Sequence, residues 1–190
     1  MTETTRTPTD LAELDRLELE QALADLGQPR FHGDQVFRWI WARGVADFAR
    51  MTDLSQSLRS TLGASCCVFT PAVEGRDTSS DGTTKFLLRL EDGRHIESVF
   101  IPDTPAQTFC VSTQVGCAMN CAFCLTGKMG LVRNLSAGEI AAQVRVLAHE
   151  TGLANAAFNI VLMGMGEPLH NYAATMKAIR ILADPQGLAV

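Results

Sequence analysis

The chain has 190 residues, of which 46% are hydrophobic and 19% charged, and its net charge is −5. The composition is typical of a soluble globular protein, the acidic balance argues against broad, non-specific binding to nucleic acids, and no apolar run reaches the ~18 residues of a transmembrane helix. The N-terminus lacks an apolar signal segment, so we expect a cytoplasmic protein in which six clustered cysteines indicate metal or redox chemistry rather than disulfides.

The first predicted domain, residues 1–64, consists of three short amphipathic helices. Asp10 and Glu13 are placed as a capping box that would begin the first helix. The other two helices are indicated by apolar residues that recur at helical spacing. These residues are Val36, Phe37, Ile40 and Trp41 in the second helix, and Leu54, Leu58 and Leu62 in the third.

Residues 65–106 are predicted to form a β-rich linker. The segment 75–82, GRDTSSDG, is typical of a turn. Two β-type runs within residues 84–101 flank the pair Asp92-Gly93, which favours a hairpin.

The remainder, residues 107–190, reads as two βα units, which places the protein in the α/β class. A strand over 107–113 precedes the cysteine-rich loop, and Ser136 with Glu139 forms a capping box that opens a helix. The apolar run 158–164 predicts a parallel strand buried on both faces, and a further helix follows it. Two parallel strands cannot close a barrel, so we expect the N-terminal part of a longer protein.

The loop CAMNCAFC places Cys117, Cys121 and Cys124 within eight residues. Chance clustering is one interpretation, although thiols in a loop are prone to oxidation. A zinc site needs a fourth ligand, and the candidates for it, none at a customary spacing, are Cys110, His149 and His170. The third interpretation is an iron–sulfur cluster held by three thiolates, with one iron open to another ligand.

A second motif, MGMGEP, follows the predicted strand at 158–164 and contains Gly166 and Glu167. A glycine lets the backbone approach a ligand closely, and a carboxylate accepts hydrogen bonds from an ammonium group. An ordinary strand-to-helix turn is the alternative.

The spacing CxxxCxxC, with Phe123 before the last cysteine, resembles the radical S-adenosylmethionine (SAM) superfamily. The longer motifs TFCVSTQVGCAMNCAFC, GLVRNLSAGEI and VLMGMGEPLHNY are similar to its RNA adenine-C2 methyltransferases. The resemblance implies the first two βα units of a partial (β/α)6-type barrel. It also implies a [4Fe–4S] cluster on Cys117, Cys121 and Cys124, SAM held by Gly166 and Glu167, and Phe123 packed beside the cofactor.

The same resemblance implies methylation of adenosine C2 in 23S rRNA and tRNA through an S-methylcysteine and a 5′-deoxyadenosyl radical. Glu97 matches the proton acceptor of the family, and Cys110 matches the cysteine that forms a disulfide to release the product. From the residues alone, Glu97 reads as a solvated carboxylate and Cys110 as a buried thiol. We expect the proton acceptor to be partly desolvated.

The implied partners are the RNA substrates and an electron donor such as flavodoxin, and the protein is expected to be a monomer that binds no membrane. Lys128, Arg133 and Arg145 give a modest positive rim beyond the cysteine loop, for which a solvated surface is the alternative. No cysteine follows Cys124 to carry the methyl group, so we expect this chain alone not to complete the methylation. The alternatives are a non-catalytic iron–sulfur or zinc RNA-binding module and a related adenine-C8 methyltransferase.

Overall fold

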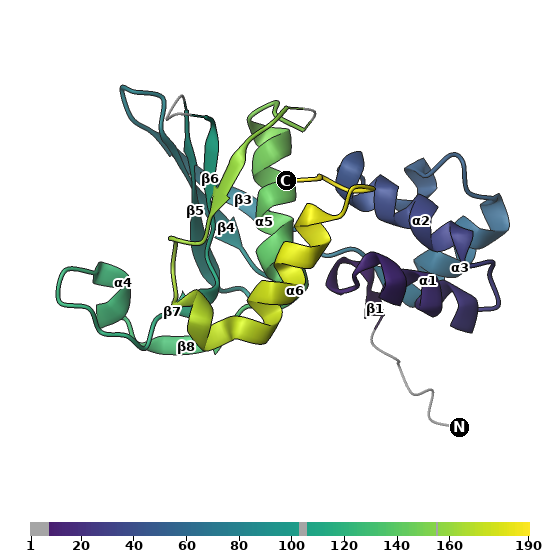
Figure 1. Cartoon of the computed structure of the whole chain (residues 1–190), viewed down its shortest axis with the longest axis horizontal. Helices are drawn as coiled ribbons and strands as arrows, with labels where there is room; N and C mark the ends of the chain where they lie inside the picture. The colour runs from purple at the N-terminus through teal and green to yellow at the C-terminus, as the bar shows by residue number, and fades with distance from the viewer. Residues whose placement is uncertain (1–7, 103–105, 155) are drawn as a thin grey trace.

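The structure is a computed structural model that describes residues 8–102, 106–154 and 156–190. The N-terminal helices form one end of the molecule, and a twisted sheet forms the other (Figure 1). Helices α5 (Ala137–Glu150) and α6 (Tyr172–Ala183) lie between the two. A single hydrophobic core runs through the helices and the sheet. No helix in the described ranges has the length and apolarity that crossing a bilayer requires.

The described part of the helical end, from residue 8 onward, contains three α-helices, as the sequence predicts. Its first helix was placed too early, because Asp10 caps only a 3-10 turn and the capping box is formed by Asp15 and Glu18. The side chain of Glu13 is instead engaged by the distant helix α5. The elements are β1 (Thr9–Asp10), η1 (Leu11–Glu13), α1 (Arg16–Asp25), α2 (Phe31–Phe37), η2 (Arg38–Ala42, a π-type turn), η3 (Phe48–Arg50), α3 (Gln56–Ser65) and β2 (Cys66–Cys67).

The main sheet has the strand order β3-β4-β5-β6-β9. The hairpin predicted at Asp92-Gly93 is present, whereas the segment predicted as a turn at 75–82 is wrong in its first half. Residues 75–78 belong to strand β3, because they find a pairing partner in β4. The strands are β3 (Ala72–Thr78), β4 (Thr84–Arg89), β5 (His95–Ile101), β6 (Thr108–Cys110) and β9 (Asn159–Val161).

Strands β6 and β9 are parallel, as predicted, and α5 (Ala137–Glu150) and α6 (Tyr172–Ala183) pack together beside them. The capping box of Ser136 and Glu139 opens α5. The prediction that 158–164 is buried on both faces is wrong. Strand β9 is an edge strand, no described strand pairs with its free side, and its residues are exposed or only partly buried.

The strands of the linker and of the C-terminal part form one continuous sheet, since β5 pairs with β6. The molecule is therefore a mixed α/β structure, as expected. A feature absent from the sequence prediction is the small hairpin of β7 (Gln114–Gly116) and β8 (Leu131–Asn134). This hairpin and α4 (Leu125–Lys128) frame the cysteine loop at one end of the sheet (Figure 1), and η4 (Pro168–Asn171) precedes α6.

Candidate functional site

The cysteine loop leaves β7 at Gly116 and enters α4 after Cys124. The amide of Cys117 donates to the carbonyl of Gly130 (3.0 Å), which anchors the start of the loop. Cys117 is buried, Cys121 and Cys124 are half-buried, and all three are free thiols. Three reduced thiols in eight residues are a donor set that fits an iron–sulfur cluster. Within the described residues, however, no three metal-binding side chains are gathered into one group.

The second loop, residues 164–167, joins β9 to η4. Gly166 has φ +101°, and a Cβ there would lie 2.6 Å from the Cβ of Gln114. The carboxylate of Glu167 accepts a hydrogen bond from the amide of Leu169 (3.0 Å) and so caps η4. Position 166 therefore requires glycine, because the backbone there lies so close to Gln114 that a side chain would overlap it.

The second loop is bonded directly to the segment that leads into the cysteine loop. The amides of Thr113 and Gln114 both donate to the carbonyl of Met165 (2.8 and 3.2 Å). In return, the amide of Glu167 donates to Oε1 of Gln114 (2.9 Å). The segment that leads into the cysteine loop and the segment that carries Gly166 and Glu167 are thus one unit.

Glu97 and Cys110 lie on the same face of the sheet. Val99 is paired with Cys110, and Glu97 is two residues from Val99 on the same strand, so the three side chains share a face. Glu97 is ion-paired with Lys85 (Oε1 to Nζ, 3.0 Å), and its side chain is 45% exposed, so its role as a proton acceptor stays a prediction. Burial raises the pKa of the Cys110 thiol, and a hydrogen bond from the backbone of Met163 opposes this only in part.

The aromatic and basic residues near the cysteine loop differ in their exposure to solvent. Phe123 is 94% exposed, so its cofactor contact stays a prediction. The predicted positive rim is wrong for Arg145, which is buried, and Arg133 is bound by both carboxylate oxygens of Glu139. Of the three rim residues, Lys128 alone is exposed, because the two arginines serve as internal structural partners.

Three polar residues that the sequence analysis did not single out connect the site. Ser112, Gln114 and Gln143 are completely buried. Ser112 and Gln114 accept hydrogen bonds from backbone amides of the second loop, and Gln143 accepts one from the amide of Ser112. The available signal for Ser112 and Gln114 was the polar run that begins at the end of the predicted strand 107–113, since polar residues are unusual at buried positions.

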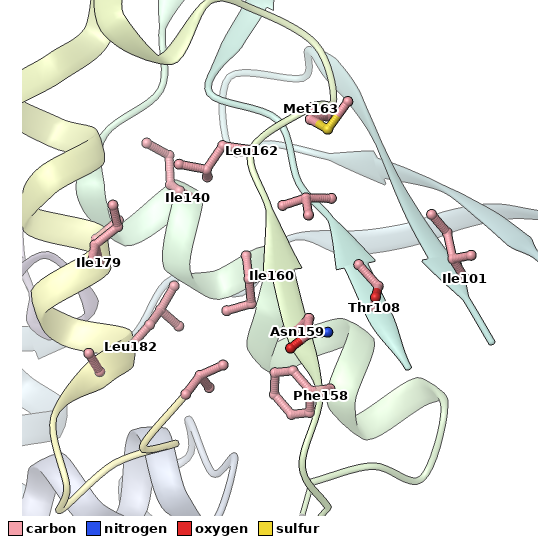
Figure 2. A pocket seen from close by; sticks show the side chains of 14 residues that line it. Ile101, Thr108, Ile140, Phe158, Asn159, Ile160, Leu162, Met163, Ile179 and Leu182 are labelled. Atoms are coloured by element: carbon pink, nitrogen blue, oxygen red, sulfur yellow. The ribbon is translucent and has the colours of Figure 1, made fainter. Parts of the chain in front are cut away.

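An apolar pocket of about 810 Å³ runs along the free edge of β9. Figure 2 shows the side chains of Phe158, Asn159 and Ile160 spaced along this strand, and those of Ile179 and Leu182 on the neighbouring helix α6. The sheet edge therefore leaves both backbone groups and apolar side chains available for a neighbour.

The chain is similar to known methyltransferases in both sequence and fold. Residues 9–68 match the family described as the ribosomal RNA large subunit methyltransferase N-terminal domain. The dual-specificity RNA methyltransferase RlmN of Syntrophotalea carbinolica is 52% identical over 180 residues, which cover 94% of this chain and 47% of that protein. The RlmN of Pelobacter propionicus is 45% identical, over 95% of this chain and 51% of its own length.

A solved structure, that of a radical SAM methyltransferase from Sphaerobacter thermophilus, matches with a TM-score of 0.87 and 43% identity. The match covers 95% of this chain and 54% of that one. The chain thus spans about half the length of the relatives it matches. The family resemblance predicted from the cysteine and glycine motifs is confirmed.

Proposed function

We propose that this chain, which shares the sequence and fold of the RlmN-type radical SAM methyltransferases over about half their length, provides the cofactor-binding half of an RNA adenine-C2 methyltransferase. The observation that carries the proposal is the bonding at Met165 of the segment that leads into the cysteine loop. This segment follows β6, the loop with Gly166 and Glu167 follows β9, and β6 and β9 are parallel neighbours. Sites of α/β proteins lie at this carboxyl end of parallel strands.

The cofactor residues take the following roles. Cys117, Cys121 and Cys124 hold the [4Fe–4S] cluster as thiolates. Gly166 admits SAM close to the backbone, and Glu167 accepts hydrogen bonds from its ammonium group. Once bound, the cluster and SAM supply the radical that an unreactive adenine carbon requires. Phe123 is available to pack against SAM.

Two residues act on the substrate side. Glu97 takes the proton from adenine C2, and its side chain is held by the ion pair with Lys85. Cys110 forms the disulfide that releases the product, with a methyl-carrying cysteine from the remainder of the protein. Their shared face of the sheet supports a common reaction space.

The architecture we propose keeps the three parts 1–64, 65–106 and 107–190, of which the last begins a partial (β/α)6-type barrel. The free edge of β9 and the apolar pocket beside it support this arrangement, since a further strand would pair there and bury the pocket (Figure 2).

The substrates proposed are 23S rRNA and tRNA, because the relatives are named dual-specificity RNA methyltransferases. An electron donor such as flavodoxin, a monomeric state and a cytoplasmic location complete the proposal.

Anaerobic reconstitution with iron and sulfide tests the proposed function. We expect about four irons per chain with broad absorbance near roughly 400 nm, and loss of both in the variant Cys121→Ala. A matched Cys67→Ala variant, which changes an exposed thiol away from the loop, should keep them. With dithionite and SAM, 5′-deoxyadenosine should form without 2-methyladenosine in RNA. One zinc per chain and no cleavage of SAM would contradict the proposal.

A further inference from the structure

Strand β5 loses its regular partner at the residue proposed as proton acceptor. The pairing of β5 with β6 covers Val99 and Cys110 but stops there. Continued in the same antiparallel register, the next pair would be Ser98 with Val111, and the pair after it would join Glu97 to Ser112. Ser112 lies beyond the end of β6, so the backbone groups of Glu97 need other partners.

Side chains supply these partners. The hydroxyl of Ser112 donates to the carbonyl of Glu97 (2.6 Å), and the amide of Glu97 donates to the sulfur of Met165 (3.4 Å). The same hydroxyl accepts a hydrogen bond from the amide of Met165 (2.8 Å). One buried oxygen therefore joins the strand of Glu97 to the loop that carries Gly166 and Glu167.

Gln143 of α5 fixes Ser112 in turn. Its Oε1 accepts from the amide of Ser112 and its Nε2 donates to the carbonyl of Ser112 (2.8 and 2.9 Å), much as a neighbouring strand would. Oε1 also accepts from the hydroxyl of Ser98 (2.8 Å), and Nε2 also donates to the carbonyl of Glu139 (3.2 Å). Gln143, Ser98 and Ser112 are each 0% exposed.

The space around this network leaves little room for adjustment. A Cβ added at Gly164 would lie 2.8 Å from the Ser112 hydroxyl and equally close to the backbone of Val111. Buried polar groups that lose a partner pay a large desolvation penalty, so the network favours one arrangement of the strand and the loop.

We propose that Ser112 and Gln143 are positioning residues that set the distance between the proton acceptor Glu97 and the SAM-binding pair Gly166-Glu167. The inference deepens the proposed function and rests on it for the roles of these residues. The hydroxyl of Ser112 makes the connection, and the side-chain amide of Gln143 holds the backbone of Ser112 in place.

Amide hydrogen exchange of the 190-residue chain tests the connection in the variant Ser112→Ala. Its matched control is Ser98→Ala. This variant removes an equally buried hydroxyl that bonds to the same glutamine but not to the loop that contains Met165. We expect the amide of Met165 to exchange ~10-fold faster or more in Ser112→Ala, and to be unchanged in Ser98→Ala. Unchanged exchange in Ser112→Ala, or the same acceleration in both variants, would overturn the proposal.

Binding of SAM to the reconstituted chain, measured by calorimetry, gives the functional readout. Ser112→Ala should weaken SAM binding ~10-fold, and Ser98→Ala should leave SAM binding unchanged. This difference should persist when the two variants unfold at the same urea concentration, that is, when their stabilities are equal. If Ser112→Ala does not fold, Gln143→Met replaces it, because this variant keeps the side-chain volume and removes the amide. It should show the same faster exchange of the Met165 amide and the same weaker binding of SAM. Equal SAM affinity in all variants would overturn the positioning role, whereas absence of SAM binding by the unaltered chain would count against the proposed function itself.

Discussion

Gly166 shows how a single residue sets the geometry of the second loop. Its φ is +101°, and an added Cβ would meet the backbone and side chain of Gln114 within 2.8 Å. Gly166→Ala should therefore lower the free energy of unfolding by about 2–4 kcal/mol, from backbone strain and overlap together. Gly152→Ala is the control, because Gly152 also has a positive φ but no atom within 4 Å, and it should cost about 1 kcal/mol. Equal losses in urea denaturation would refute the overlap.

Cys110 is a thiol whose reactivity burial should suppress. Since burial raises its pKa, a smaller fraction is thiolate at pH 8 than in the unfolded chain. We expect alkylation of Cys110 by iodoacetamide to be at least ~10-fold slower in the folded apo-chain than in urea, by peptide mass spectrometry.

The same shift links Cys110 to stability. The unfolded chain releases the thiol proton at lower pH than the folded chain, so the stability that this group contributes is lost as pH rises beyond about 8.5. The variant Cys110→Ser should show a smaller loss between pH 8 and 10. An identical pH profile for both proteins would argue against a buried Cys110.

At the level of elements, helix α5 is capped from a distant part of the chain. Glu13 of η1 accepts hydrogen bonds from the hydroxyl of Ser136 and from the amide of Gly138 (3.1 Å). A carboxylate at this end of a helix also interacts favourably with the helix dipole. Glu13→Ala should cost about 1–2 kcal/mol of stability.

A double-mutant cycle isolates this contact from the local capping box. Ser136→Ala removes the hydroxyl that both Glu13 and Glu139 engage, so we expect a coupling energy with Glu13→Ala of about 1 kcal/mol. Strictly additive losses would mean that Glu13 does not interact with the Ser136 hydroxyl.

For the whole molecule, Arg145 joins the helical end to the sheet. Its guanidinium donates to the carbonyl of Phe69 and to Thr70 Oγ1 (2.8 Å) and lies 5.1 Å from the ring of Trp41. Burial lowers its pKa to about 10, so the group stays charged at neutral pH. Its position in α5 makes it the link between α5, the chain that enters β3 and the N-terminal helices.

Arg145→Ala should lower stability by about 2–4 kcal/mol, because it leaves the Phe69 carbonyl unpaired and opens a cavity beside Trp41. The control Arg76→Ala breaks a more exposed pair with Glu150 and should cost less than about 1 kcal/mol. Both tryptophans lie in the helical end, so fluorescence follows that end while circular dichroism follows the whole chain. The link would be contradicted if the fluorescence and circular dichroism transitions of Arg145→Ala coincide and are not shifted from those of the unaltered chain.

Signals confined to a few neighbouring residues predicted much of this molecule. The capping box at Ser136 and the hairpin at Asp92-Gly93 are present, because caps and tight turns are chosen by local backbone preferences. The cysteine and glycine motifs identified the family for the same reason, since their chemistry depends on a fixed spacing along the chain. The helix start at Asp10 failed because Glu13, its intended partner, bonds instead to residues more than a hundred positions away.

The tertiary structure alone decided how these local pieces meet. Strand β3, the exposed edge of β9 and the burial of Arg145 depend on which distant segments pair or pack, and no short stretch of sequence contains that information. The contacts of Ser112 arise in the same way, because a strand that ends early leaves backbone groups that only a residue from elsewhere can satisfy. The sequence by itself determined the motifs that show the family resemblance, because these depend on local spacing, and the fold determined the distances between them, because these depend on how distant segments pack.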